Sequence, residues 1–421
     1  NFYVTLRSKI VFMPNKRKII NDPVYGFLTI EDDIIFDVIA HPYFQRLRNI
    51  KQLGFSYLVY PGATHSRFGH ALGALNLMGR ALEVLKVKGV PITEEESIGV
   101  KLAILLHDIG HGPFSHTLEH TLIDLDHETI TRCFMDRLNE AFGGRLSVAM
   151  AIFDDVYPKH FLHQLVSSQL DMDRLDYLGR DSFFTGVSEG VVGTERIINM
   201  LNVAGDELVI DEKGIYSVEK FIISRRLMYW QVYLHKTVVA ADQVLLSVLR
   251  RAKELYQKGA ILDQNHKPIV VGEVLEQFLC GRWSADDMRH NAAALDSFAS
   301  LDDTDIHVAV KQWTRAEDLV LNLLASQLTY RNLPSLRMSG QPFEPEVEET
   351  LRVQTQLIFN LSNEESAYFV GRGTMENHAY DFNDPEIGVK MKDGKCLDIS
   401  KASDQLDRHF LEKTVRKFFI Y

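Results

Sequence analysis

Residues 103–116 read AILLHDIGHGPFSH, an apolar run that ends in an adjacent histidine and aspartate. The apolar residues predict the last turns of a buried helix, and the glycines and proline that follow predict sharp turns. Divalent metals favour imidazole nitrogen and carboxylate oxygen, and His107 and Asp108 supply one of each. His111 would share their face if the helix continued that far.

A purely structural interpretation is that the histidines of this run are buried core residues without a catalytic role. A single buried histidine is usually a hydrogen-bonded core residue. Four imidazoles and two carboxylates lie between residues 106 and 120, however, beside an apolar helix. Burying so many polar groups without a function would be costly, so the pattern favours a functional site.

Two more candidate ligands lie outside this run. His70 ends the segment HSRFGH, just ahead of a helix predicted to begin near Ala71, and Asp173 lies in the segment SQLDMDRLDY. Spacings of three and four place Asp173, Asp176 and Tyr177 on one helix face. Each signal is weak alone, because an interhelical histidine or a solvated acidic face would look the same.

Helical periodicity dominates from about residue 32 to residue 250. Beyond the helix near Ala71, a second helix is predicted over 94–106, where Thr93 and Glu96 have the spacing of a capping box. A long helix is predicted over 221–256, ending before Gly259, and further helices are predicted over 286–330.

Strand-like patterns lie toward both ends of the chain. Residues 3–12 predict a short strand, 21–26 a turn, and 388–395 a hairpin with an Asp-Gly turn, while 351–360 alternate and are rich in β-forming residues. We therefore expect a mainly α fold: a helical core with a short N-terminal β segment and a mixed α+β C-terminal module. The expected domains are 1–255, with the site and an N-terminal regulatory segment, and 256–421.

Composition narrows the class of partner and the cellular location. The 421 residues are 46% hydrophobic and 24% charged, which is enough to bury a large core. A net charge of -11 argues against an extended nucleic-acid surface but leaves room for a small anionic ligand in one basic pocket. Three scattered cysteines and the lack of a long apolar run predict a reduced, cytoplasmic protein without a membrane partner.

The candidate ligands also match a known family. His70, His107, Asp108 and Asp173 reproduce the H…HD…D pattern of the HD superfamily of metal-dependent phosphohydrolases. The extended string 107–116 resembles the deoxynucleoside triphosphate triphosphohydrolase branch of that superfamily. Further matching segments are 18–26 (KIINDPVYG), 44–54 (FQRLRNIKQLG), 60–70 (YPGATHSRFGH), 171–181, 233–236 and, less closely, 301–305.

This resemblance implies a reaction and roles for particular residues. The four ligands would hold one divalent metal, Mn, Mg, Fe, Ni or Zn, while water attacks the α-phosphorus of a deoxynucleoside triphosphate, releasing deoxynucleoside and triphosphate. The residues implied around the phosphate are His111, His116, His127 and Glu119. Glu119 would orient His116 or His127. Which histidine acts as the general acid stays open. The residues implied to bind substrate are Gln52, Leu53, Arg67, Arg174, Tyr177, Asp181, Arg225 and Tyr233.

The resemblance further implies a homo-oligomer, a tetramer or a dimer, with regulatory nucleotides between subunits. The matching regulatory positions are Lys18, Asn21, Gln45, Arg48, Val59, Tyr60, His235 and Lys236. Ala40 departs from the pattern, because the human enzyme of this branch has a guanine-reading aspartate there. Whether a nucleotide activates this chain, and which one, therefore stays open.

Two alternative functions fit the same sequence pattern. One is an HD phosphohydrolase that acts on another phosphoester, such as a nucleoside monophosphate or a signalling nucleotide. The other is a nucleotide-binding regulator without catalysis, which a degraded ligand set would favour, whereas here the set is intact.

Overall fold

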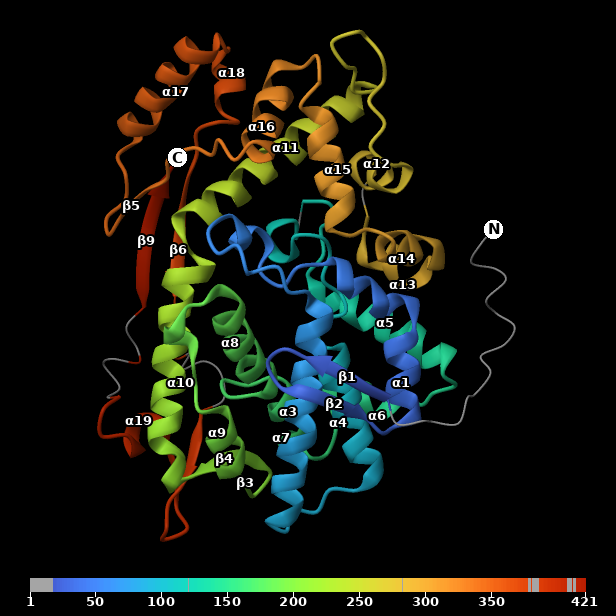
Figure 1. The fold of residues 1–421 in the computed structure, drawn as a ribbon, viewed down its shortest axis with the longest axis vertical. Coiled ribbons are helices and arrows are strands. Elements are labelled where there is room, and N and C mark those ends of the chain that lie inside the picture. The colour runs from blue at the N-terminus through green and yellow to red at the C-terminus, as the bar shows by residue number, and fades with distance from the viewer. Residues whose placement is uncertain are drawn as a thin grey trace.

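The chain folds into a mainly helical body with small sheets at its edges, as predicted (Figure 1). The computed structural model describes residues 18–119, 121–281, 283–377, 380, 386–406, 411 and 414–421, and of His116 the backbone alone. The strand predicted at 3–12 lies outside the described residues.

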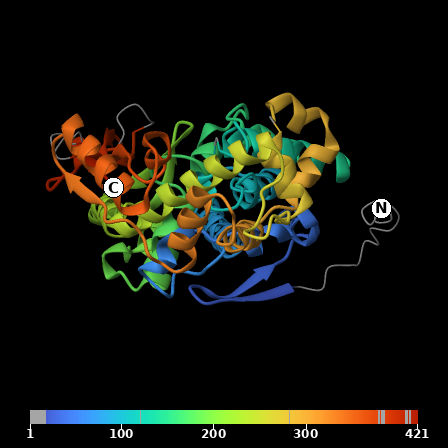
Figure 2. The same ribbon diagram turned by 90° about the horizontal axis from the view of Figure 1, so that it is seen from above.

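A β-hairpin opens the described chain and lies along the lower edge of the view in Figure 2. Its strands β1 (Lys18–Asp22) and β2 (Gly26–Ile30) pair from Lys18 opposite Ile30 to Asp22 opposite Gly26. The predicted turn at 21–26 is confirmed. Asp22 Oδ1 accepts the backbone N–H groups of Val24 and Tyr25, each at 2.9 Å, and Gly26 has φ 77°, which favours glycine.

The helices that follow form the core of the first half. They are α1 (Asp33–Ala40), α2 (Pro42–Gln45), α3 (Arg67–Val87), α4 (Glu94–Leu106), α5 (His127–Ala141), α6 (Ser147–Phe153), α7 (His160–Val166), α8 (Met172–Thr185) and α9 (Thr194–Met200). The 3₁₀ turns between them are η2 (Arg46–Asn49), η3 (Gly54–Leu58), η4 (Ser115–Thr117), η5 (Ser188–Gly190) and, further on, η6 (Glu212–Gly214).

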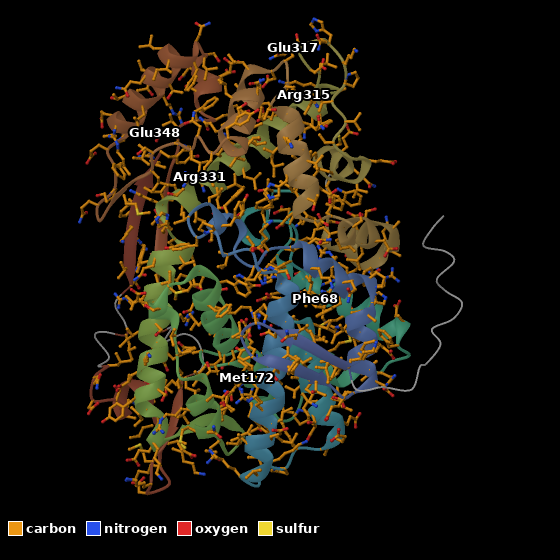
Figure 3. The ribbon with its side chains drawn as sticks, in the orientation of Figure 1. Phe68, Met172, Arg315, Glu317, Arg331 and Glu348 are labelled. Atoms are coloured by element: carbon orange, nitrogen blue, oxygen red, sulfur yellow. The ribbon has the colours of Figure 1, made fainter. Side chains whose placement is uncertain are left out.

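Helix α3 packs against both α4 and α8. Phe68 of α3 and Met172 of α8, labelled in Figure 3, are buried in this interior. Helix α4 starts with the predicted capping box: Glu96 N–H donates to Thr93 Oγ1 at 3.2 Å, and Thr93 N–H donates to Glu96 Oε2 at 2.8 Å.

Helix α3 begins one turn earlier than predicted. The Ser66 carbonyl accepts the N–H groups of Gly69 (3.0 Å) and His70 (3.3 Å), so the first turn forms despite its glycine. The expectation that His70 precedes the helix is therefore wrong: His70 lies inside α3, whose direction fixes where its ring points. His111, by contrast, lies beyond the end of α4 at Leu106, in a non-helical segment.

The long helix predicted over 221–256 is broken in two. Helix α10 (Ile215–Met228) runs into a π-helical turn, Tyr229–Tyr233, and α11 (Lys236–Lys258) follows a bend of 56°. His235 caps α11, because its Nδ1 accepts Thr237 N–H at 3.2 Å. No single helix in the described ranges is long and apolar enough to span a bilayer. The bent pair of α10 and α11, taken together, reaches the length and apolar composition of a membrane span.

The C-terminal half is mixed, as predicted. Its helices are α12 (Glu273–Cys280), α13 (Ala285–His290), α14 (Ala292–Ala299), α15 (Asp303–Trp313), α16 (Leu319–Thr329), α17 (Pro345–Phe359), α18 (Asn363–Ser366) and α19 (Ile399–Ala402). One sheet has the order β3 (Leu201–Ala204), β4 (Glu207–Asp211), β7 (Gly388–Lys390), β8 (Cys396–Asp398), and the other β5 (Arg337–Ser339), β9 (Val415–Ile420), β6 (Arg372–Asn377).

Two strand expectations in this half have opposite outcomes. The hairpin with an Asp-Gly turn is confirmed, since β7 and β8 pair antiparallel and Gly394 has φ 87°. The strand-like interpretation of 351–360 is wrong, because these residues belong to α17, which has Pro345 at its first position and ends at the left-handed Asn360. These end signals outweigh the β propensity between them.

Packing crosses the expected boundary between domains 1–255 and 256–421. Strand β4 pairs in parallel with β7, placing Val209 opposite Gly388. One hydrophobic cluster extends from Leu28 to Leu411. The division into two domains stays a prediction, but the second half packs directly against the first.

A candidate metal centre and its cavity

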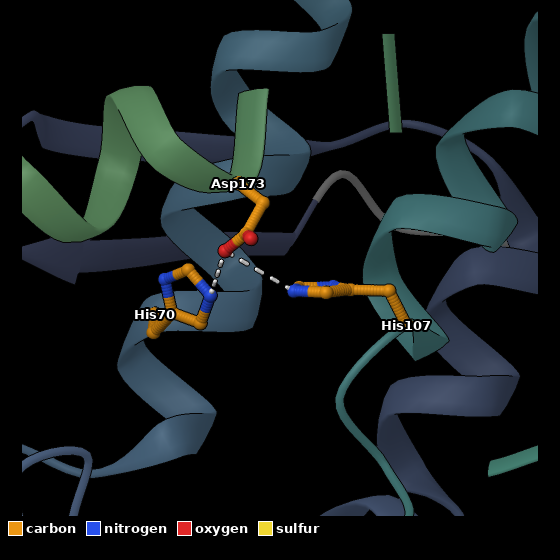
Figure 4. Close-up of side chains that lie close together, drawn as sticks. All are labelled: His70, His107 and Asp173. Atoms are coloured by element: carbon orange, nitrogen blue, oxygen red, sulfur yellow. Dashed lines mark ion pairs between the residues drawn. The ribbon is translucent and has the colours of Figure 1, made fainter. Parts of the chain in front are cut away.

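Three helices bring the four predicted metal ligands together. His70 comes from the first turn of α3, His107 and Asp108 from the end of α4, and Asp173 from the first turn of α8. His70 Nε2 and His107 Nε2 both point at Asp173 Oδ1, at 3.0 and 3.3 Å (Figure 4). Asp108 adds Oδ1 at 3.5 Å from His107 Nε2 and Oδ2 at 3.9 Å from His70 Nε2.

These distances fit a single metal ion. Ligand bonds of about 2.0–2.2 Å place neighbouring ligand atoms about 3–3.5 Å apart in tetrahedral or octahedral geometry. The Nε2 atoms of His70 and His107 are buried and make no hydrogen bond of good geometry with any residue that the structure describes. Two imidazoles and two carboxylates suit Mn, Mg, Fe, Ni or Zn, so the residues present fit the implied ion.

The other ring nitrogens of these histidines are held in place. His70 Nδ1–H donates to Asp176 Oδ2 at 2.8 Å, and His107 Nδ1–H donates to the Ile104 carbonyl at 2.6 Å. Because both acceptors lack hydrogens, the proton of each neutral ring sits on Nδ1 and leaves Nε2 for a metal. Arg180 in turn fixes Asp176, with Nε at 2.9 Å from Oδ2 and Nη2 at 3.1 Å from Oδ1.

Close packing of α3 on α8 makes this support possible. A Cβ atom added to Gly73 would lie 2.0 Å from Asp176 Oδ1 and 2.1 Å from Arg180 Nη2. Arg180 also donates from Nη1 to Asp22 Oδ2 at 2.8 Å, which ties the β1–β2 turn to the site. The spacing from Asp173 predicts Asp176 on the ligand-bearing helix face, but it does not predict the contact with His70.

Charged neighbours within the ligand cluster shift the pKa values of His70 and Asp108 in opposite directions. Burial by itself lowers the pKa of His70, but the carboxylates of Asp173 and Asp176 outweigh burial and raise it to about 10. Burial favours a protonated Asp108, yet the charges of His111 and His107 hold its pKa well below the usual range. The carboxylates are therefore ionised and the imidazoles proton-rich, so cation binding here displaces protons.

Arg67, His111 and His127 of the predicted site lie near Asp108. Arg67 Nη1 donates to Asp108 Oδ2, and His111 Nδ1 lies 3.4 Å from Asp108 Oδ1. The His111 and His127 rings are 4.0 Å apart between centroids, and His127 Nδ1 hydrogen-bonds Glu119 Oε1 at 2.7 Å. Glu119 thus contacts His127; the side chain of His116, the other predicted partner, lies outside the described atoms.

The turn after His111 has a supporting residue that the sequence did not identify. Phe114 and Ser115 have φ 55° and 50°, a left-handed conformation that costs non-glycine residues about 1–3 kcal/mol each. Asp303, buried at the start of α15, accepts Phe114 N–H at Oδ1 and Lys51 N–H at Oδ2, each at 2.9 Å. It therefore ties this turn to the segment that carries the predicted substrate residues 52 and 53.

An open cavity of about 380 Å³ adjoins the ligand cluster. Asp108 and Asp173 of the ligand cluster line it, as do the neighbouring His111 and His127. Six of the eight predicted substrate residues line it as well: Gln52, Leu53, Arg67, Tyr177, Asp181 and Tyr233. Arg174 and Arg225 are not among the lining residues. Arg174 pairs with Asp171 at the start of α8, and Arg225 lies 6.0 Å from the Tyr229 ring centroid.

Asp181 is fixed within this wall. Its Oδ1 accepts from His65 Nε2 and its Oδ2 from the Tyr233 hydroxyl, both at 2.8 Å. The ring of Tyr233 meets that of Tyr177 edge to face, with centroids 6.2 Å apart. A carboxylate has about four acceptor positions, so Asp181 retains capacity for a ligand hydroxyl.

The predicted regulatory residues fall into two groups. Lys18, Asn21, Gln45 and Arg48 come from β1, α2 and η2; Arg48 donates to Gln45 Oε1 at 2.8 Å. Val59, Tyr60, His235 and Lys236 come from the end of η3 and the start of α11; the Tyr60 and His235 rings meet edge to face at 6.2 Å. Their role at a subunit interface stays a prediction.

Comparison with known proteins agrees with this geometry. Residues 67–181, which include all four candidate ligands, match the HD domain model, and residues 192–265 match the HD associated region. A phosphohydrolase structure from Bacteroides thetaiotaomicron superposes with a TM-score of 0.91 at 47% identity, covering 96% of this chain and 99% of that one. The chain belongs to the HD-domain phosphohydrolase family.

Within that family, two kinds of relative are informative. The uncharacterized protein YwfO of Bacillus subtilis is 33% identical over 404 residues, covering 92% of this chain and 88% of its own. The human deoxynucleoside triphosphate triphosphohydrolase SAMHD1 is 29% identical over 282 residues, or 56% of this chain, which spans 45% of the human protein. The chain thus matches about half the length of that enzyme.

Proposed function

We propose that this phosphohydrolase cleaves deoxynucleoside triphosphates into deoxynucleoside and intact triphosphate, with water attacking the α-phosphorus. The supporting observation is that one cavity of about 380 Å³ combines the ligand cluster with a wall of Tyr177, Asp181 and Tyr233. A phosphate would meet the cluster while a sugar meets that wall. The similarity to named deoxynucleoside triphosphate triphosphohydrolases supports the same substrate class.

The residues of the cluster divide the work of phosphate chemistry. A divalent metal held by His70, His107, Asp108 and Asp173 would supply Lewis acidity toward a phosphate oxygen and make water more acidic. Arg67, on the same wall as Asp108, would bind phosphate oxygens through its planar fork of donors.

Proton transfer falls to the histidines beside the cluster. Glu119 fixes the His127 ring through Nδ1 and leaves Nε2 for the substrate or a water molecule. His111 packs against His127 and lies beside Asp108, which places both rings near the reacting phosphate.

The sugar wall would select deoxyribose over ribose. A tyrosine ring packed against C2′ leaves no space for a 2′-hydroxyl, and Tyr177 and Tyr233 present two rings there. Asp181, held by His65 and Tyr233, would accept a hydrogen bond from the 3′-hydroxyl. A ribonucleotide would then be rejected by steric overlap.

We also propose that the chain works as a homo-oligomer, a tetramer or dimer, with nucleotides bound between subunits at the two regulatory groups. Ala40 offers no carboxylate to read guanine, so this proposal does not require a guanine nucleotide as activator. Turnover of each substrate alone and in mixtures, compared with the mass in solution, tests it.

Product analysis tests the reaction. The protein is incubated with Mn²⁺ or Mg²⁺ and each deoxynucleoside triphosphate, singly and mixed, and the products are separated by ion exchange. Deoxynucleoside plus triphosphate is expected, lost in the double variant His107→Ala/Asp108→Ala. Release of pyrophosphate or phosphate, or no turnover with any of these substrates, would reject the proposal.

A further inference from the structure

A hydrogen-bonded pair, Asp242 of α11 and Thr117, lines the same cavity, and the proposed reaction gives this pair no role. Asp242 accepts a hydrogen bond at Oδ1 from Thr117 Oγ1 at 2.9 Å, and both residues line the cavity. Val238, one turn earlier on the same face of α11, lines it as well. Helix α11 packs against η3 and η4, so Asp242 and Thr117 lie on a cavity wall that packed elements form.

The charge environment separates Asp242 from the ligand cluster. Burial raises the pKa of Asp242 to about 7, the Thr117 hydrogen bond opposes this rise, and no charged side chain of the described residues contributes. Asp108, within the cluster, instead has His111, His107, Arg67 and His70 as charged neighbours. Arg67, which would help to hold the triphosphate, donates to Asp108, whereas the hydrogen-bond partner of Asp242 is the neutral hydroxyl of Thr117.

The cavity that Asp242 and Thr117 line also has apolar lining residues. Leu53, Phe55, Phe114 and Val238 line the cavity with the pair, and the Phe55 and Phe114 rings have centroids 4.6 Å apart. A cavity with apolar and aromatic lining and a few placed polar groups suits a flat heterocycle, whose faces contact carbon while one edge forms hydrogen bonds. A carboxylate suits the triphosphate poorly, because like charges repel.

We propose that Asp242, oriented by Thr117, binds the edge of the nucleobase and selects guanine. This inference rests on the proposed function, since it assigns the base position of that substrate. Above its pKa of about 7 the Asp242 side chain is ionised and accepts hydrogen bonds only, and guanine presents two adjacent donors, N1–H and the 2-amino group. Hypoxanthine keeps N1–H but lacks the 2-amino group, and thymine offers one N–H between two carbonyl oxygens that would repel the carboxylate.

The test compares dGTP with 2′-deoxyinosine triphosphate, which differs only by the 2-amino group. The kcat/KM values of the full chain with Mn²⁺ are measured for both, and for TTP, in the wild type and in Asp242→Asn. Wild type is expected to prefer dGTP over the inosine analogue by about tenfold, the range of a good base-specific contact. Asp242→Asn is expected to reduce this ratio to about one and leave TTP within about twofold.

A matched variant on the same helix controls for loss of charge. Glu254→Gln makes the same acid-to-amide change on α11, twelve residues and about 18 Å further along the axis. It is expected to keep the wild-type ratio. Thr117→Val, which removes the donor that orients Asp242, is expected to lower the ratio partway.

Binding to metal-depleted protein gives a second readout that needs no turnover. Calorimetric titration with dGTP and the inosine analogue is expected to give the same tenfold ratio in affinity, lost in Asp242→Asn. Equal affinities in wild type, or a uniform loss for all three substrates in Asp242→Asn, would overturn the inference. If wild type hydrolyses no deoxynucleoside triphosphate, the proposed function fails, while the binding ratio still decides the role of Asp242.

Discussion

Replacing Asp303 by asparagine should loosen two segments of the cavity at once. Its carboxylate accepts Phe114 N–H and Lys51 N–H, each at 2.9 Å, from segments far apart in the sequence. An asparagine of the same shape keeps one acceptor oxygen and turns an amide NH₂ toward the other N–H group. One of two charge-assisted hydrogen bonds is therefore lost, and the other becomes neutral.

The size of the effect follows from these two contacts. A hydrogen bond to a charged group contributes about 1.5–3 kcal/mol, and 1.4 kcal/mol is a factor of ten. Phe114 and Ser115 are in left-handed conformations, so the loss also releases a strained turn. We expect Asp303→Asn to raise amide exchange of residues 112–116 and 50–53 about 10- to 100-fold and to lower turnover by a similar factor.

Hydrogen exchange followed by mass spectrometry measures this directly, with Asp305→Asn as the matched control. Asp305→Asn makes the same charge change on the same helix, but the Asp305 carboxylate caps α15 by accepting Asp302 N–H at 2.9 Å, with no other hydrogen bond among the residues that the structure describes. The bound metal content should stay at the wild-type level in both variants. Unchanged exchange in Asp303→Asn, or an equal rise in the Asp305→Asn control, would refute the positioning role.

Three further predictions concern the metal support, the core and the cavity wall. Asp176→Asn should weaken divalent metal binding about 10- to 100-fold by competitive chelator titration, whereas Asp22→Asn, which changes the other partner of Arg180 and leaves Asp176 in place, should keep most affinity. Gly73→Ala should lower the unfolding free energy by about 1–3 kcal/mol in urea, because its Cβ overlaps the Asp176–Arg180 pair; an unchanged midpoint would count against this packing. The pKa of Asp242 is about 7 in the folded chain and 3.8 in the unfolded chain, so the folded chain binds this proton more tightly. The stability that the bound proton contributes is fully present below pH 3.8 and is lost as the pH rises through 7. In thermal melts, the wild type should lose stability over this pH window more steeply than Asp242→Asn.

Local signals predicted the fold where they were strong. The Thr93–Glu96 capping box, the Asp-Gly hairpin and the glycine at 259 all describe contacts within a few residues, and the structure contains each of them. The break at 234–235 escaped prediction, because no glycine or proline marks it and the apolar periodicity continues through it. Its π-helical turn makes contacts with distant residues: the Tyr60 hydroxyl donates to the Gln231 carbonyl at 2.6 Å, and the Tyr233 hydroxyl donates to Asp181 Oδ2 at 2.8 Å.

The ligand set was accessible from sequence because its residue types are rare together in that order. Its support was not, since the partners are distant in the chain: Asp176 is 106 residues from His70, and Asp303 is 189 residues from Phe114. A carboxylate that accepts two backbone N–H groups looks, in sequence, like any acidic residue at a helix start. Asp242 likewise resembles an ordinary polar position on an amphipathic helix.

Hydrolysis in H₂¹⁸O tests the central claim most directly. If water attacks the α-phosphorus at the ligand cluster, mass spectrometry should find one ¹⁸O atom in the released triphosphate and none in the deoxynucleoside. Removal of the metal with a chelator should abolish both products, and added Mn²⁺ should restore them. Label in the deoxynucleoside, or pyrophosphate or phosphate in place of triphosphate, would contradict the account.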